Sequence, residues 1–266
     1  MYYTYFMKTK ATYYSLQQGQ HIRIAQISDL HQGNPEASIQ ILKEWKPDLI
    51  LITGDLLERF SLDKKEISIM KDWQGVKKKP VLYAFTSIFY RNKELQNSSC
   101  DKAYFLLEQA SKIAKVFYSI GNHEWYFTQE DYAVFEKYNI TILDNQDTVF
   151  NHIRIGGLST KYDIDWIKSF SKKEGYKILM MHHPEYYDRY IKENDTFNLI
   201  LSGHFHGGQI RIGKKGLFGP GQTILPKYGY GKYSTKKGYM IVSAGLSNTV
   251  KIPRLGNPCE VVIIDI

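Results

Sequence analysis

The chain has 266 residues and a mass of 31.0 kDa, and 43% of its residues are hydrophobic and 23% charged. This composition is typical of a soluble globular protein with one domain or two at most, and it excludes disordered and collagen-like chains. Lys and Arg total 35 against 27 acidic residues. The resulting formal charge of +8 indicates an anionic partner, such as phosphate, nucleic acid or acidic lipid.

The sequence gives no sign of a membrane span or a secretory signal. The longest apolar stretches have the length of a strand, well short of the ~18 residues that a spanning helix needs. Cys100 and Cys259 lie far apart and match neither a metal-binding spacing nor a redox motif, which predicts free thiols in a reducing compartment. We therefore expect a cytoplasmic protein, with peripheral contact to an anionic membrane as an open alternative.

Five apolar runs, each ending in Asp, His, Asn or Gly, predict buried strands. They span residues 21–29, 48–55, 115–122, 177–182 and 198–204. Their continuous apolar character predicts cover on both faces, by helices on either side.

Two helices are predicted between these strands. The first covers 36–45, after Asn34 as a cap and Pro35 at the first helical position, and the second covers 101–114 with Asp101 as a cap. From Gln209 onward, glycine-rich turns separate short strands that include 239–243 and 260–265, and this pattern predicts antiparallel β-structure in the same domain.

Polar residues stand at the carboxyl end of each predicted strand, where α/β proteins place their sites. In chain order these blocks are Asp29-Leu-His31, Gly54-Asp55, Gly121-Asn122-His123-Glu124, His182-His183-Pro184 and Gly203-His204-Phe205-His206. Mixed carboxylate, amide and imidazole donors suit first-row divalent ions such as Mn, Fe, Co or Zn. Two ions ~3.5–4 Å apart form the arrangement that hydrolyses phosphate esters. The glycines before the ligands predict tight turns and close approach of the backbone.

With all five blocks present in order, the sequence resembles the calcineurin-like metallophosphoesterase superfamily. Residues 203–209 and 253–260 are similar to the YkuE/YaeI-type phosphodiesterase branch, which includes UDP-2,3-diacylglucosamine pyrophosphatases. The resemblance implies an α/β fold, a four-layer α-β-β-α sandwich with mixed sheets, as one domain over 1–266. It also implies two divalent metal ions, with Mn favoured, and a phosphodiesterase or pyrophosphatase that acts on a lipid- or nucleotide-linked phosphoester.

The same resemblance assigns roles to the residues that match its pattern. His123 lies near the phosphate and protonates or stabilises the leaving oxygen, and a metal-bound hydroxide is the nucleophile, with Asp55 and Asn122 also in the catalytic centre. The implied ligands are Asp29, His31 and His206 at metal site one, Asn122, His182 and His204 at metal site two, and Asp55 as the bridge. His21, His152 and His183 are predicted to be surface or supporting histidines.

The stretch of about 62–99 is predicted to be an insertion between the second and third blocks. In it, Lys77–Lys79 is interpreted as a solvated turn and Val81–Tyr90 as a core strand, and the alternative is a lipid-contacting element. Two alternative functions are compatible with the same metal ligands: a nuclease, and a non-catalytic scaffold that binds the metals. The sequence has no basic-aromatic repeat of the kind that nucleic-acid binders use, and it leaves the substrate, the native metal and the oligomeric state open.

Overall fold

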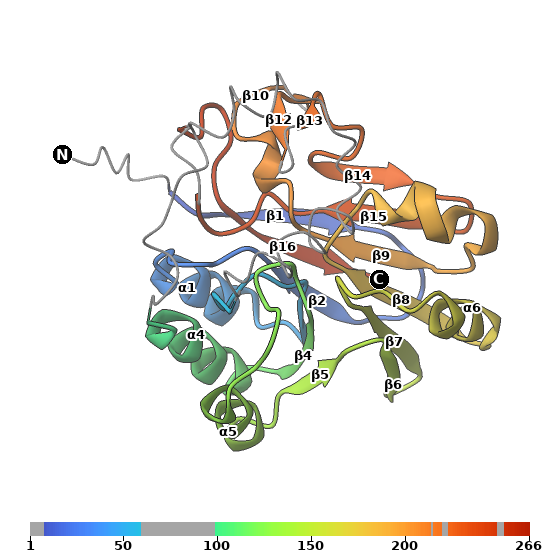
Figure 1. Ribbon diagram of the computed structural model, residues 1–266, viewed down its shortest axis with the longest axis horizontal. Helices are drawn as coiled ribbons and strands as arrows, with labels where there is room; N and C mark the ends of the chain where they lie inside the picture. Colours follow the sequence, from blue (N-terminus) through green and yellow to red (C-terminus); the bar gives the residue numbers. More distant parts are fainter. Residues whose placement is uncertain (1–7, 60–98, 214, 220–222, 249–252) are drawn as a thin grey trace.

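The computed structural model describes residues 8–59, 99–213, 215–219, 223–248 and 253–266 (Figure 1). Most of the predicted insertion, including Lys77–Lys79 and Val81–Tyr90, lies outside the described residues. Within the described part, no helix is long and apolar enough to cross a membrane. Cys100 and Cys259 are both buried and free.

Two six-stranded mixed sheets form the centre of the fold. In the first sheet, β16 runs antiparallel to β2 and every other neighbouring pair is parallel. Its strands, in spatial order, are β1 (Lys10–Ser15), β16 (Glu260–Asp265), β2 (Arg23–Ile27), β3 (Leu49–Ile52), β4 (Lys115–Ser119) and β5 (Thr141–Leu143).

The second sheet has a parallel centre and an antiparallel pair at each edge. Its strands, in spatial order, are β14 (Gly231–Ser234), β15 (Tyr239–Val242), β9 (Leu199–Ser202), β8 (Tyr176–Met181), β7 (Ile153–Leu158) and β6 (Gln146–Phe150).

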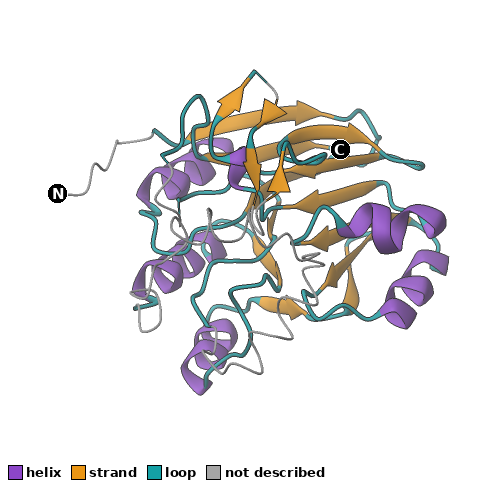
Figure 2. Ribbon diagram, turned by 45° about the horizontal axis from the view of Figure 1, so that its top comes forward, coloured by secondary structure: helices purple, strands orange, loops and turns teal. Residues whose placement is uncertain are grey.

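Helices cover the outer face of each sheet, so the chain is a four-layer α-β-β-α sandwich (Figure 2). On the first sheet lie α1 (Glu36–Trp45), α4 (Asp101–Ser111) and α5 (Gln129–Lys137). On the second lie α6 (Ile164–Lys172) and the π-helical turn η2 (Tyr187–Ile191), which is followed by the 3₁₀ turn η3 (Lys192–Asn194).

Alternation along the strands builds three apolar layers. In β3, Leu49 and Leu51 point into the core between the two sheets, whereas Ile50 and Ile52 point into the core beneath α1 and α4. The third layer packs Phe170 of α6 against the outer face of the second sheet. The expected α-β-β-α sandwich with mixed sheets is therefore confirmed. The expectation of helices on both faces of each strand is wrong, because the inner face of each sheet is covered by the other sheet.

The predicted helices need small corrections at their ends. α1 has the predicted bounds, but Pro35 occupies the N-cap position, and Asn34 Oδ1 accepts a hydrogen bond of 2.9 Å from Glu36 N. α4 ends at Ser111 rather than at residue 114, because the chain turns there into β4. Asp101 is its first helical residue and does not cap it.

The C-terminal prediction of antiparallel structure is right only in part. Antiparallel pairs form between β10 (Arg211–Ile212) and β11 (Lys215–Gly216), and between β12 (Phe218–Gly219) and β13 (Thr223–Ile224). β15 is antiparallel to β14 on one side but parallel to β9 on the other, and β16 is antiparallel to β2 but parallel to β1. The last strands thus complete the two central sheets, which brings residues near the C-terminus close to the strand ends that carry the polar blocks.

Candidate metal centre

The carboxyl ends of strands from both sheets meet at one edge of the sandwich. The first sheet delivers Asp29 after β2 and Asp55 after β3, and the second delivers His182 after β8 and His204 after β9. Direct contacts join the two sheets here, because His204 N lies 3.1 Å from Asp29 Oδ1 and His182 Nε2 lies 3.1 Å from Asp55 Oδ2. The structure thus brings the predicted blocks into one centre.

The described residues include four overlapping groups of possible metal ligands, and two of these groups lie side by side in this centre. Within each group the donor atoms stand no more than 4.8 Å from one another. Of the two adjacent groups, the first consists of Asp29, His31 and His206, and the second of Asp55, His182 and His204. The other two are His31 with Asp55 and His123, and His183 with Glu185 and His204.

The first group is the set that the sequence predicts for metal site one. The second group contains His182 and His204 of the set predicted for site two, together with the predicted bridge Asp55, but not Asn122. His31 Nε2 lies 3.8 Å from Asp55 Oδ2, so Asp55 faces both groups.

Five residues of these groups have a left-handed backbone, which only glycine adopts freely. Their φ angles lie between 47° and 73° for Asp29, His31, Asp55, His204 and His206. A non-glycine residue in this region costs about 1–3 kcal/mol and persists only where the surrounding structure enforces it. Five of the six donors have this conformation, although eight other described non-glycine residues share it, and such backbone strain at a ligand site is typical of a geometry that serves a ligand.

Two of the predicted glycines are required by close approach of the strand-end loops. A Cβ atom at Gly121 would stand 2.6 Å from Asp55 N and would also collide with Asp55 Oδ1. A Cβ at Gly203 would stand 2.5 Å from Asp29 Oδ2 and would also collide with Ser28 Oγ. The missing side chains leave room for the two carboxylates, which lets the loops from both sheets come together.

Hydrogen bonds at Nδ1 orient three of the imidazoles. His182 Nδ1 lies 2.7 Å from Thr53 O, and His206 Nδ1 lies 3.2 Å from Ser247 O. A carbonyl oxygen only accepts, so Nδ1 carries a proton in both rings, and Nε2 of each ring faces the centre. For His31 the partner is the Glu58 carboxylate, at 2.6 Å. Such partners fix the orientation of metal-ligating histidines.

Glu58 is a functional candidate that the sequence analysis missed. Its buried carboxylate accepts from His31 Nδ1 through one oxygen and lies 2.8 Å from His123 Nδ1 through the other. Burial alone would raise the pKa of Glu58, but the two imidazoles outweigh burial and lower this pKa to about 2. The sequence clue to Glu58 is its position three residues after Asp55, on the same loop.

Glu124, the last residue of the third block, holds two of the strand-end loops together. Its buried carboxylate accepts hydrogen bonds from the backbone amides of Asp55, Leu56, Leu57 and Gly121, at 2.7–3.1 Å, and from the Tyr118 hydroxyl. The sequence analysis quoted this residue without giving it a role. Its contacts show how the loops after β3 and β4 keep a fixed relative position.

Electrostatics divides the imidazoles of the centre into two kinds. Burial lowers the pKa of His206 to about 4 and that of His204 well below its usual value, so both are neutral, as metal ligands must be. Burial opposes the charged form of His182 and His123 as well, but neighbouring carboxylates outweigh it. Asp55 raises the pKa of His182 to about 9, and Glu58 with Asp55 raises that of His123 to about 10. His182 Nε2 faces Asp55 at 3.1 Å, so His182 would have to release its Nε2 proton to bind an ion there.

The donor set fits divalent metal ions by two observations. His31 Nε2 and Asn122 Oδ1 are buried, and neither makes a hydrogen bond within the part of the chain that the structure describes. His206 Nε2 and Asp29 Oδ1 lie 3.6 Å apart, too far for a hydrogen bond. Two ligands of one ion, each at ~2.0–2.2 Å from it, can stand up to about 4.2 Å apart. These donors are therefore spaced for shared ions.

The three remaining histidines differ from one another. His21 and His152 are exposed, as the sequence predicts. His183 is fully buried, so a surface position is excluded for it. Its ring lies 4.2 Å from that of His204, and its nitrogens lie 3.2 Å from Glu185 Oε1 and 3.3 Å from Thr160 Oγ1. His183 therefore packs against His204 and connects it to Glu185 and Thr160.

The fold is that of the metallophosphoesterases, and the side chains at this edge could hold metal ions. The chain belongs to the calcineurin-like phosphoesterase family, whose sequence model matches residues 22–208.

Among its relatives, the uncharacterized protein YpbG of Bacillus subtilis is 32% identical over 54% of this chain and 55% of its own length. The uncharacterized metallophosphoesterase YkoQ of the same organism is 26% identical over 71% of this chain and 62% of its own length. In Campylobacter jejuni, the uncharacterized metallophosphoesterase Cj0846 is 27% identical over 71% of this chain and 45% of its own length. The chain thus spans about half the length of these relatives.

One solved structure with a TM-score of 0.50 agrees with the fold. This crystal structure superposes at 12% identity, covering 84% of this chain and 90% of the other chain. The phosphoesterase Yfce from E. coli gives a TM-score of 0.43 at 11% identity, over 92% of this chain and 88% of Yfce.

Proposed function

We propose that the protein hydrolyses phosphoesters, with phosphodiesters or pyrophosphates as substrates, at a centre of two divalent metal ions. The observation that carries this proposal is the pair of adjacent donor groups, Asp29–His31–His206 and Asp55–His182–His204, at one edge of the sandwich. Two ions in such a centre lower the pKa of a water molecule and stabilise the negative charge that develops on the phosphoryl group.

Each donor has a defined place in this proposal. Asp55 bridges the two sites, since its carboxylate faces His31 at 3.8 Å and His182 at 3.1 Å. Asp29, His31 and His206 hold one ion. Asn122 completes the other site beside His182 and His204, because its buried Oδ1 lacks a hydrogen bond among the described residues.

His123 is the residue of the centre best placed to exchange a proton with the substrate. Its side chain is 22% exposed, whereas those of His31, His182 and His206 are at most 6% exposed. Glu58 holds Nδ1, and Nε2 lies 3.9 Å from Asp55 Oδ2, at the centre itself. In this role His123 donates a proton to the oxygen of the leaving alcohol or phosphate.

The finer identity rests on sequence motifs. Within the family we assign the chain to the YkuE/YaeI-type branch, from residues 203–209 and 253–260, with Mn as the favoured ion. We also treat 1–266 as one domain with an insertion at about 62–99. A lipid- or nucleotide-linked phosphoester fits the formal charge of +8.

The test is hydrolysis of bis-p-nitrophenyl phosphate by protein loaded with Mn²⁺, before and after removal of the metal by EDTA. We expect turnover that chelation abolishes and added Mn²⁺ restores. Asp55→Asn is expected to lower kcat by at least ~10²-fold and to weaken binding of both ions, because one carboxylate serves both sites. Wild-type turnover in Asp55→Asn, or turnover that survives EDTA, would contradict the proposal, and a metal-loaded protein without turnover would favour the scaffold alternative.

A further inference from the structure

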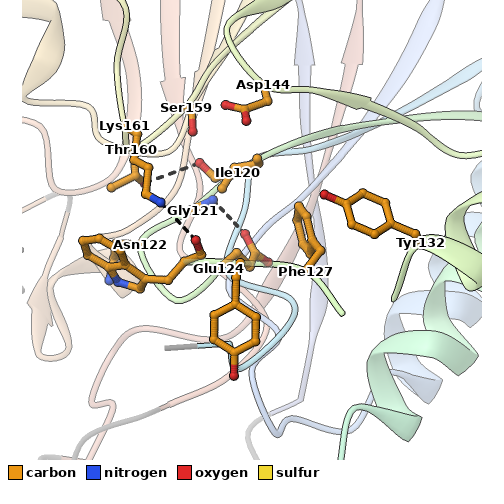
Figure 3. A pocket seen from close by; sticks show the side chains of 12 residues that line it. Ile120, Gly121, Asn122, Glu124, Phe127, Tyr132, Asp144, Ser159, Thr160 and Lys161 are labelled. Atoms are coloured by element: carbon orange, nitrogen blue, oxygen red, sulfur yellow. Dashed lines mark hydrogen bonds between the residues drawn. The ribbon is translucent and has the colours of Figure 1, made fainter. Parts of the chain in front are cut away.

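A small pocket of about 130 Å³ opens beside the metal centre (Figure 3). Its walls come from four segments that are distant in the sequence. They are the loop after β4, the start of α5, the turn after β5 and the loop after β7. The function proposed above leaves this pocket without a role.

The pocket is continuous with the metal centre. Asn122, the proposed ligand of the second ion, lines it, and so does Gly121, which packs against Asp55. Thr160, which also lines the pocket, has its Oγ1 3.4 Å from Ile120 O and 3.3 Å from the Nε2 of the supporting residue His183. A substrate whose phosphate lies at the centre can therefore extend a group into the pocket.

The size of the pocket limits what it can hold. Sites that enclose a whole small molecule typically have ~300–1,000 Å³. A pocket of about 130 Å³ accepts only one part of a substrate, such as a single ring system.

Aromatic side chains make up much of the wall. Trp125, Tyr126, Phe127 and Tyr132 all line the pocket, and Phe127 and Tyr132 meet edge to face with their ring centres 5.8 Å apart. Tyr126 and Tyr132 are 51% and 55% exposed, although they are large and partly apolar. Flat rings of this kind are stacking platforms for the bases of nucleic acids and nucleotides.

Polar groups at the other side of the pocket argue against an alkyl chain as its occupant. Asp144 and Lys161 line it together with Ser159, and the Lys161 ammonium lies 3.1 Å from Trp125 O. Both charged groups are exposed, and an alkyl chain would offer neither of them a hydrogen bond. A nucleobase offers amino groups to a carboxylate and carbonyl oxygens or ring nitrogens to an ammonium.

We propose that this pocket binds the nucleobase of a nucleoside-containing phosphoester whose phosphate lies at the metal centre. The inference rests on the function proposed above and narrows its substrate class to nucleotides and nucleotide-linked esters. The pocket selects the substrate, and the metal centre carries out the hydrolysis.

The test compares AMP with ribose 5-phosphate, because the two share the phosphate and the sugar and differ only in the base. Affinities are measured by isothermal titration calorimetry on the full chain loaded with Mn²⁺. We expect AMP to bind at least tenfold more tightly, a ratio that corresponds to ~1.4 kcal/mol. In the double variant Tyr126→Leu, Tyr132→Leu the preference for AMP should fall about tenfold, toward equal binding.

Tyr13→Leu is the matched control. Tyr13 is also an exposed tyrosine, at 47%, and stacks on Trp45 with ring centres 5.5 Å apart, but it lies on β1 and does not line the pocket. It should keep the preference for AMP.

Two results would overturn the assignment of the pocket. They are equal affinity of the wild-type protein for both ligands, and a preference for AMP that the double variant retains. Hydrolysis of bis-p-nitrophenyl phosphate by the same preparation reports on the proposed function separately. If that hydrolysis persists, only the base pocket fails. If the metal-loaded protein lacks it, the proposed function fails, and the pocket assignment fails with it.

Discussion

Replacing Gly121 by alanine tests whether the close approach of the strand-end loops is needed for the centre. Gly121 does not have a left-handed backbone, so alanine introduces no φ strain, and its effect comes from the added methyl group. The new Cβ would stand 2.6 Å from Asp55 N, and an ordinary contact begins at 3.4 Å. The two loops must therefore separate by about 0.8 Å. They cannot do so freely, because the Glu124 carboxylate binds Gly121 N at 2.7 Å and Asp55 N at 3.1 Å.

A displacement of this size at the bridging carboxylate should damage catalysis more than stability. Misplacing a reacting group by ~1 Å can cost ~10²-fold in rate. Adding a methyl group to a packed interior typically costs ~1–3 kcal/mol of unfolding free energy. We expect Gly121→Ala to lower kcat/KM for bis-p-nitrophenyl phosphate about 10²-fold and to weaken metal binding, while the protein stays folded. Steady-state kinetics under Mn²⁺, metal analysis and thermal melting measure the three effects.

Gly156→Ala provides the matched control for overpacking. A Cβ at Gly156, in β7, would stand 2.8 Å from Cζ of Phe170, in the core beneath α6. This variant should lose comparable stability and keep its metal content and kcat/KM at low temperature. If Gly121→Ala retains the wild-type kcat/KM and both ions, the close packing against Asp55 is not needed for catalysis and the reasoning is refuted.

Three further variants probe the groups around the centre. His123→Ala should lower kcat by ~10²–10⁴ and leave the metal content unchanged. The loss should be larger on alkyl esters than on p-nitrophenyl esters, because the p-nitrophenolate leaving group needs little protonation. An equal loss on both kinds of ester would exclude a role of His123 as proton donor. Glu58→Gln leaves one acceptor for two imidazole N–H groups, so we expect metal affinity or activity to fall ~10–100-fold, and unchanged values in a metal titration would contradict the orienting role. Burial favours a raised pKa for Asp131, but hydrogen bonds from Arg59 and its other partners outweigh burial and lower it. The ionised Asp131 therefore stabilises the folded protein above the ordinary pKa of 3.8, and this contribution is lost as pH falls through the lower pKa of the folded state. In urea unfolding, Asp131→Asn should have a free energy of unfolding ~3 kcal/mol below that of the wild type at pH 7, and the difference should shrink below pH 4. A difference that stays constant with pH would refute this link between protonation and stability.

The sequence was most informative where strands are continuously apolar. β3 and the first three residues of β9 are aliphatic, and every residue of both strands is buried, so their positions and the polar residues after them could be predicted. α5 and α6 were missed although both carry cap signals. Thr128 and Asp131 form a capping box at α5, and Asp163 accepts from two amides at the start of α6. α5 is mostly polar and buries only Asp131 and Phe135, so its sequence shows little helical periodicity of apolar residues.

Long-range pairing could not be derived from local patterns. β1 alternates in exposure and pairs in register with β16, about 250 residues away, and no local signal indicates that partner. Glu58 was missed for a related reason. Its role depends on His31 and His123, which come from different loops and meet its carboxylate only in the folded chain. The positions of the proposed ligand residues were easier to predict, because each follows shortly after its own strand.

The central claim is that two metal ions lie on either side of Asp55. Anomalous diffraction from a crystal of the full chain grown with Mn²⁺ tests it most directly. The account predicts two anomalous peaks, one among Asp29, His31 and His206 and the other among Asn122, His182 and His204, with the Asp55 carboxylate between them. A single peak, or peaks that do not contact Asp55, would contradict it.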